Sequence, residues 1–151
     1  MSNFYMTLSA DEISRQVAGL LNTHNKLFTT HSAYSIMHGL ANYFVETYGD
    51  KIVGCSAIIQ ETETVTRQFH LCVDPAFRRQ GIARRVKRAS LKHVKTPFVY
   101  VTIREDNAAS IALNVSEGFK LVKKDWSRGY YVLVFAKDLR INNFMEVAQW
   151  T

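Results

Sequence analysis

The stretch Val73-Asp-Pro-Ala-Phe-Arg-Arg-Gln-Gly-Ile-Ala-Arg84 is the most informative part of this 151-residue chain. Its pattern predicts a strand that stops at Pro75, followed by a turn with arginines and a glycine that begins a helix. Such a turn presents backbone N–H groups to an anion, because the first N–H groups of a helix have no partner within the helix. The stretch therefore predicts a phosphate-binding site.

The basic residues of the chain are concentrated beside this turn. Eight arginines and lysines lie between Pro75 and Lys95 with no acidic residue among them, whereas the other 11 basic residues face all 13 acidic ones. This window therefore accounts for the whole net charge of +6. A local positive field raises the concentration of a small polyanion around it, so a polyphosphate cofactor is a sufficient explanation of the charge.

Helix-like and strand-like patterns extend from the turn in both directions. Ser9 with Glu12 three residues later predicts a capping box, and the helix that follows is expected to end where Asn22–Asn25 breaks the pattern. Gly49-Asp50 predicts a hairpin turn. Further helices are expected over residues 29–39, 81–95 and 107–117, and strands over residues 3–8, 42–48, 51–60, 64–73, 98–103, from 119, and 130–136. Strands and helices alternate after Val73, which predicts a parallel strand pair and a mixed α/β fold class.

Composition predicts one globular domain, because 151 residues with 47% hydrophobic content suit a single core. We expect this domain over residues 1–138, and an extension over residues 139–151 that packs on the body or on a second subunit. No apolar run approaches the length of a membrane span and the N-terminus lacks the features of a signal peptide, so a cytoplasmic location is predicted. Cys55 and Cys72 lie in apolar, strand-like segments and are interpreted as small buried hydrophobic residues.

Three motifs in register resemble the GNAT acyltransferase superfamily. Arg78-Arg79-Gln80-Gly81-Ile82-Ala83 is similar to the Arg/Gln-x-x-Gly-x-Gly/Ala motif with which that family binds the pyrophosphate of acetyl-CoA. Leu71–Pro75 resembles the family's fourth strand, and Asn107–Phe119 resembles its next helix and the Gly-Phe opening of the following strand. The nearest likeness is to small stand-alone members from prokaryotes and their phages.

The resemblance implies a fold and an activity. The fold is an antiparallel N-terminal meander followed by a βαβαββ half with a splayed parallel strand pair. The activity is N-acetyl transfer from acetyl-CoA to a primary amine, by direct attack through a tetrahedral intermediate. We expect the amine to belong to a small molecule or to a protein, and the enzyme to be a monomer or a homodimer.

The resemblance also implies which residues bind acetyl-CoA. Gly81 and Ala83 let backbone N–H groups approach a diphosphate, and the helix dipole adds about half a positive charge there. The main chain of Leu71–Val73 binds the pantetheine arm, and one of its N–H groups polarises the thioester carbonyl. Asn107 is equally well interpreted as a helix N-cap, and Ser110 as an ordinary first-turn residue. The implied cofactor-binding residues are Leu71, Cys72, Val73, Arg78, Arg79, Gln80, Gly81, Ile82, Ala83, Arg84, Asn107 and Ser110.

The positions of the catalytic side chains depart from the family's pattern. An amine such as lysine, with a pKa of about 10.4, must lose a proton, and the family often places a glutamate or histidine base on the strand before the motif. That place falls on Arg67 or Phe69, neither of which is a base, and His70 lies on the opposite face if the strand is regular. The family's frequent tyrosine acid falls on Asn114, which is no acid but can hydrogen-bond the sulfur. The catalytic residues are therefore unassigned, and the candidates that remain are His70, Glu61, Glu63, Tyr130 and Tyr131, or a proton path through water.

Two other classes of function stay open. One is a protein that binds acyl-CoA without efficient turnover. The other is a nucleic-acid-binding module, in which Arg84, Arg88, Lys92 and Lys95 share one exposed side of a helix, and a hybrid would acylate an amine carried by tRNA or DNA. No metal is expected, because the histidines spaced by seven, His24, His31 and His38, lack the spacing and carboxylates of a metal site. We expect residues 23–39 and the loops beside residues 125–129 to determine which acceptor is used.

Overall fold

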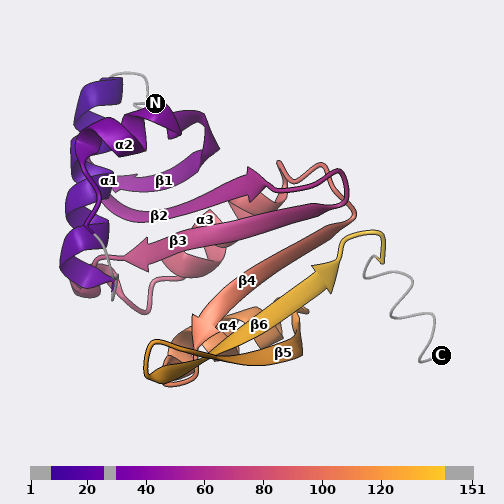
Figure 1. The fold of residues 1–151 in the computed structure, drawn as a ribbon. Helices are drawn as coiled ribbons and strands as arrows, with labels where there is room; N and C mark the ends of the chain where they lie inside the picture. Colours follow the sequence, from indigo (N-terminus) through magenta and orange to yellow (C-terminus); the bar gives the residue numbers. More distant parts are fainter. Residues whose placement is uncertain (1–7, 26–29, 142–151) are drawn as a thin grey trace. The chain divides into compact units, whose positions relative to one another are not determined.

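Four α-helices and six strands make up the part of the chain described by the computed structural model, residues 8–25 and 30–141. In chain order (Figure 1) they are α1 (Ala10–His24), α2 (Ala33–His38), β1 (Tyr43–Tyr48), β2 (Lys51–Gln60), β3 (Val65–Val73), α3 (Ile82–Leu91), β4 (Phe98–Arg104), α4 (Ala108–Ser116), β5 (Lys120–Ser127) and β6 (Tyr130–Asp138), with the short 3₁₀ turns η2 (Leu40–Asn42) and η3 (Pro75–Phe77). The strand order is β1-β2-β3-β4-β6-β5, and β3 runs parallel to β4. The mixed α/β class predicted from the sequence is confirmed.

The chain divides into two compact units. The first comprises Met1–Ile58 and Phe69–His93, and the second comprises Ile59–Gln68 and Val94–Thr151. A single domain over residues 1–138 with an extension over 139–151 stays a prediction. The expected strand at residues 3–8 and most of the expected tail helix lie outside the described residues.

In the first unit, α1 begins and ends where the sequence predicts. The Ser9 side chain accepts a hydrogen bond from the Glu12 backbone N–H at 3.0 Å, so the predicted capping interaction at Ser9 is confirmed. The helix ends at His24 with Asn25 as its C-cap, so its predicted end within Asn22–Asn25 is confirmed. Asn22 is accommodated inside the helix since its side-chain amide makes two hydrogen bonds, of 2.7 and 2.8 Å, with the backbone of His31.

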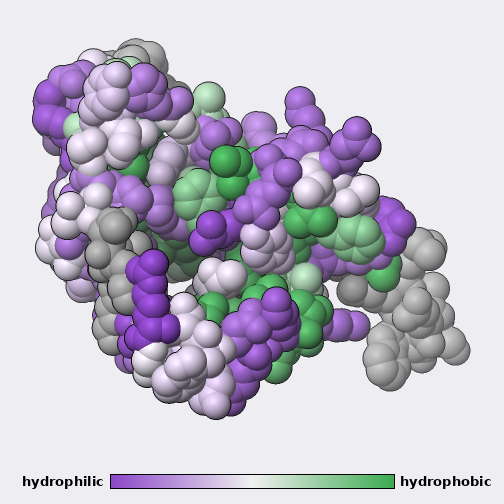
Figure 2. Space-filling model, viewed as in Figure 1, coloured by the Kyte–Doolittle hydropathy of each residue, from purple (hydrophilic) through white to green (hydrophobic). Residues whose placement is uncertain are grey.

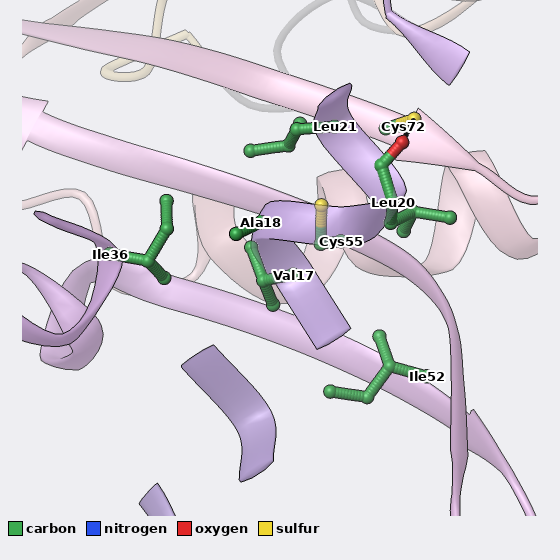
Figure 3. Packing of buried hydrophobic residues seen from close by; sticks show 8 residues of the cluster. All are labelled: Val17, Ala18, Leu20, Leu21, Ile36, Ile52, Cys55 and Cys72. Atoms are coloured by element: carbon green, nitrogen blue, oxygen red, sulfur yellow. Dashed lines mark hydrogen bonds between the residues drawn. The ribbon is translucent and has the colours of Figure 1, made fainter. Parts of the chain in front are cut away.

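Helices pack on both faces of the strands of the first unit (Figure 1). On one face, α1 and α2 bury a cluster that includes both cysteines (Figure 3). Its buried members are Val17, Ala18, Leu20, Leu21, Ile36, Ile52, Cys55 and Cys72. On the other face, Ile82 and Val86 of α3 pack against Val53 of β2, with Leu71, Val73 and Phe77 around them. Burial of one such aliphatic side chain contributes roughly 1.5–3 kcal/mol, so both faces stabilise the unit.

Gly54 of β2 permits the close packing of α3. A Cβ atom built on Gly54 would lie 2.4 Å from Cγ2 of Ile82, a distance that real Cβ atoms essentially never show. Ile82 is the first residue of α3 and is buried. The missing side chain in β2 therefore sets where the N-terminus of α3 lies.

The second unit contains the parallel strand pair and the C-terminal hairpin. β3 and β4 pair at Val65–Phe98, Thr66–Val99 and Arg67–Tyr100, and the antiparallel hairpin of β5 and β6 pairs with β4 through β6. The buried hydrophobic residues of β4, β6 and the turn after α4 are Val99, Val101, Ile103, Leu133, Phe135 and Phe119. On β5, Leu121, Val122 and Trp126 are exposed, and Figure 2 shows hydrophobic residues on the surface of this unit.

The bounds of α3 differ from the prediction, whereas those of α4 agree with it. α3 ends at Leu91 and not at Lys95 as predicted, so Lys92 is its C-cap and Lys95 lies beyond it. Asn107 caps α4, whose bounds agree with the predicted helix. In the described part of the chain, no helix is both long enough and apolar enough to span a membrane.

Candidate functional site

The turn between β3 and α3 is fixed at its start by Asp74. The Asp74 carboxylate accepts a hydrogen bond from the Ala76 backbone N–H at 2.9 Å and lies 3.0 Å from Nζ of Lys51. The backbone hydrogen bond first, and Lys51 second, hold the pKa of the Asp74 carboxyl below its usual value. The carboxylate therefore stays charged and caps η3 across the physiological range.

The residues that follow adopt a backbone suited to binding an anion. Arg79 and Gly81 both have positive φ, 64° and 77°. Gly81 is the N-cap of α3, and no side chain caps that end of the helix. Left-handed residues in a turn direct neighbouring N–H groups toward one side, and the helix dipole favours negative charge at the same place. The predicted phosphate-binding turn thus has the local geometry that such a site needs.

Arg85 holds this turn in shape, a role that the sequence did not reveal. Its Nη1 donates to the backbone carbonyl of Gln80 at 2.7 Å. Its Nε and Nη2 donate to the two carboxylate oxygens of Glu46 on β1, both at 2.7 Å. Such a bidentate pair is among the stronger polar contacts of a protein surface. The clamp, defined as Arg85 with Glu46 and the Gln80 carbonyl, ties the turn to β1.

The clamp should make stability depend on pH through Glu46. The hydrogen bonds from Arg85 lower the pKa of the Glu46 carboxyl, so their stabilisation is complete above the ordinary glutamate pKa and is lost as the pH falls through the lowered value. We expect Glu46→Gln to lower the melting temperature at pH 7, and the difference from wild type to shrink toward pH 3. Thermal unfolding between pH 3 and pH 7 measures this. A constant difference over that range would contradict the role of the carboxylate.

The other basic residues of this region do not all share one exposed helical side. Lys87 of α3 is fully buried, and Arg84 is partly buried. Arg88, Lys92 and Lys95 are exposed, but Lys95 lies past the end of the helix. The predicted four-residue stripe is therefore wrong in its last member.

The end of β3 presents its side chains alternately to the two faces of the first unit. Leu71 and Val73 pack with the α3 cluster, whereas Cys72 packs with the α1 cluster. Burial raises the pKa of the Cys72 thiol to about 11, and that of Cys55 still further, so both are protonated at neutral pH. Neither cysteine is suited to act as a nucleophile.

His70 departs from regular strand geometry. Its φ is 55°, so the expectation of a regular β3 is wrong at this residue. The hydroxyl of Tyr43 lies 2.7 Å from Nδ1 of His70, and the His31 ring packs edge-on against the His70 ring with centroids 4.6 Å apart. Burial raises the pKa of Tyr43 to about 12, so its phenol keeps its proton.

The remaining predicted residues belong to the second unit. The Asn107 side chain accepts from the Ser110 backbone N–H at 3.2 Å, and Nδ2 of Asn114 donates to the Ser110 carbonyl at 2.9 Å. Asn114 is buried, and within the described residues its Oδ1 has no hydrogen-bond partner. Asn107 is thus a helix cap, as one of its two interpretations predicted, and its contact with a cofactor stays a prediction.

Three of the alternative candidates in the second unit, Glu61, Tyr130 and Tyr131, make side-chain contacts. The Tyr100 hydroxyl donates to Glu61 at 2.5 Å. The Tyr130 ring lies 4.0 Å from the Arg104 guanidinium carbon, and the Tyr131 ring lies 4.2 Å from Nζ of Lys124. These contacts hold each group in a structural interaction.

Comparison with known proteins identifies relatives of this chain. A sequence model of the acetyltransferase (GNAT) family matches residues 18–119. The N-alpha-acetyltransferase RimI of Mycobacterium tuberculosis is 35% identical over 77 residues, which is 49% of this chain and 49% of that protein. The match therefore spans about half the length of this relative.

Solved structures agree with the fold. Ard1 of Thermoplasma volcanium superposes with a TM-score of 0.73 at 18% identity, over 87% of this chain and 93% of that one. The protein yncA of Salmonella typhimurium, solved with its cofactor acetyl-CoA, has a TM-score of 0.71 at 14% identity, over 89% of this chain and 90% of that one. At these identities the likeness shows the fold.

Proposed function

This chain belongs to the GNAT acetyltransferase family, and on that premise we propose that it transfers an acetyl group from acetyl-CoA to a primary amine in the cytoplasm. The single observation that carries the proposal is the turn from Arg78 to Arg84, with its two left-handed residues and uncapped helix end. The matched region contains this turn together with the end of β3 and α4.

The residues of the turn fit a diphosphate. Gly81 leaves the N-terminus of α3 open, because it has neither a Cβ nor a capping side chain. Arg78 and Arg79 supply positive charge beside it, and the clamp keeps the turn in place without a ligand. A preformed site of this kind loses little entropy when the ligand binds. Arg78–Arg84 would therefore hold the pyrophosphate of coenzyme A.

The end of β3 would hold the acyl arm. The parallel pairing of β3 with β4 covers three residue pairs, Val65–Phe98 to Arg67–Tyr100, and Leu71–Val73 lie beyond it. An extended ligand can add to such a strand by backbone hydrogen bonds. When bound, acetyl-CoA supplies an acetyl group activated as a thioester. A backbone N–H of Leu71–Val73 would stabilise the charge that develops on its carbonyl oxygen.

We further propose a protein α-amine as the first acceptor to test. The support is the named activity of one relative, RimI of M. tuberculosis, an N-alpha-acetyltransferase. The matched stretch covers only half of that protein, so the acceptor needs its own measurement.

The test is release of free coenzyme A when purified protein is mixed with acetyl-CoA and a panel of acceptors. The panel contains peptides with a free α-amine, the same peptides with that amine blocked, free lysine, polyamines and aminoacylated tRNA. We expect turnover only with acceptors that carry a free primary amine, and mass spectrometry should find one added acetyl group. Tight binding of acetyl-CoA without turnover on any acceptor would replace this function with that of an acyl-CoA-binding protein, an alternative favoured by Arg67 and Asn114 at the places of the family's base and acid.

A further inference from the structure

An exposed aromatic side chain lies beside the phosphate turn, residues 78–84. Tyr48 is the last residue of β1, and it is 70% exposed. Its ring contacts the ring of Phe77, with the centroids 5.4 Å apart and an angle of 50° between the planes. Phe77 directly precedes the phosphate turn in the chain. Tyr48 thus presents a largely uncovered ring next to the place where the pyrophosphate is proposed to bind.

The Phe77 ring is itself firmly held. It is partly buried and packs against the α3 cluster. Lys51 is opposite Tyr48 in the hairpin, and its Nζ lies 5.4 Å from the centroid of the Phe77 ring. The same Nζ lies 3.0 Å from the Asp74 carboxylate, which caps η3. Because Phe77 holds the Tyr48 ring, we expect a substitution in the hairpin turn at Gly49 to leave both rings in place.

Two contacts of β1 bring the aromatic pair close to the phosphate turn. Tyr48 contacts Phe77, just before the turn. Glu46 binds Arg85, which also donates to the Gln80 carbonyl within the turn. Glu46 and Tyr48 are two residues apart on β1, which is about 7 Å along a strand. A ligand with its phosphates in the turn can therefore place a ring on Tyr48 through a linker as short as a ribose.

The chemistry of this place suits a purine that carries phosphate groups. The face of a tyrosine ring can stack on any nucleobase, and such stacking contributes substantially to the binding of unpaired bases. Three cations lie near the ring in the chain or across the hairpin, and all three are exposed: Lys51, Arg78 and Arg79. Positive charge beside an aromatic surface favours an adenosine phosphate over a neutral apolar ligand.

We infer that Tyr48 is the stacking platform for the adenine ring of coenzyme A and that Phe77 is the residue that positions it. The inference rests on the cofactor of the proposed function, because it presumes that the pyrophosphate lies at Arg78–Arg84. It assigns a contact to the half of the cofactor that takes no part in the chemistry. No bond forms or breaks there, so the contact acts on affinity and not on acetyl transfer itself.

The binding test uses Tyr48→Ala and the two halves of the cofactor. We expect the affinity for acetyl-CoA to fall about tenfold, or about 1.4 kcal/mol, which is within the usual cost of removing one stacking ring. Adenosine 3′,5′-bisphosphate, the adenine half, should show the same loss. Acetyl-4′-phosphopantetheine, the thioester half, should bind the variant as well as wild type. Isothermal titration with acetyl-CoA, and its displacement by each half, measure these affinities.

Two further variants separate stacking from other effects. Tyr48→Phe keeps the ring face and loses only the hydroxyl, so its affinity for acetyl-CoA should stay within about twofold of wild type. Tyr34→Ala is the matched control, because Tyr34 is 74% exposed on α2 of the same unit and also contacts a neighbouring ring, that of His38. It should bind acetyl-CoA as wild type does. Thermal unfolding checks that each variant is folded.

Three results would overturn the inference and leave the proposed function intact. The first is an unchanged affinity of Tyr48→Ala for acetyl-CoA, and the second is an equal loss of affinity for acetyl-4′-phosphopantetheine. The third is an oligonucleotide whose binding depends on Tyr48 while the binding of acetyl-CoA does not. Absence of turnover with the expected binding pattern would overturn the proposed function and support the inference. A wild-type protein that binds no acetyl-CoA would overturn both.

Discussion

Replacing Gly81 by valine should weaken acetyl-CoA binding by about 100-fold, which corresponds to about 2.7 kcal/mol. Gly81 has φ of 77°, where a β-branched residue is disfavoured by at least 1–2 kcal/mol. A Cβ built there would lie 3.0 Å from Nη1 of Arg85, so the new side chain would also disturb the clamp. Both effects move the N–H groups at the start of α3. Isothermal titration with acetyl-CoA measures the loss.

Gly49→Val is the matched control for Gly81→Val. Gly49 lies in the hairpin turn of the same unit with a similar φ of 63°, and nothing lies within 4 Å of a Cβ built on it. This variant should lose stability in thermal unfolding and keep its affinity for acetyl-CoA. Equal affinity losses in the two variants would show that strain alone lowers binding, and the phosphate site would have to be sought elsewhere.

Gly54→Ala should destabilise the protein by about 1–3 kcal/mol, the usual cost of one overpacked methyl group. The added Cβ would lie 2.4 Å from Cγ2 of Ile82, a branched atom held close to the backbone, so α3 must shift. Because α3 begins at Ile82, the shift should also weaken acetyl-CoA binding, by about tenfold, or about 1.4 kcal/mol. Chemical unfolding gives the first quantity and titration the second.

A double-mutant cycle isolates the clash. Ile82→Ala removes Cγ2 and should itself cost about 2–4 kcal/mol through lost burial. In that background Gly54→Ala should cost less than about 0.5 kcal/mol, because the atom it would meet is gone. Gly19→Ala, on α1 with open space at its Cβ, is the control and should be neutral or slightly stabilising. An undiminished cost of Gly54→Ala in the Ile82→Ala background would contradict the close contact.

Local signals predicted much of the fold. The Ser9 cap, the Gly49 hairpin and the Asn107 cap each depend on a few neighbouring residues, and all three lie where expected. The helix α1 also ends within the predicted residues 22–25, but the sequence could not show how Asn22 fits inside it. Asparagine usually breaks a helix because its side chain competes for backbone groups, but Asn22 uses its side chain on the backbone of His31. Only the folded chain brings those two residues together.

The sequence also did not indicate which residues hold the candidate site in shape. Arg85 and Glu46 lie 39 residues apart, so no local sequence pattern predicts their contact. In the sequence, Arg85 is only one of eight basic residues near the turn. Alternation along β3 assumes regular strand geometry, and the left-handed His70 breaks that assumption through contacts with Tyr43 and His31. The motif at Gly81 predicted which turn could bind phosphate. The motif carried no information on which residues hold the turn in place.

The burial of the two cysteines has a practical consequence for measuring turnover. Cys55 and Cys72 are the only cysteines of the chain, their exposed fractions are 0% and 4%, and both thiols stay protonated at neutral pH. A thiol must be accessible and ionised to react quickly with a coloured disulfide reagent. The native protein should therefore be silent in such an assay, and the colour that develops during turnover should report coenzyme A alone. A slow rise in colour when acetyl-CoA is also left out would then report opening of the core.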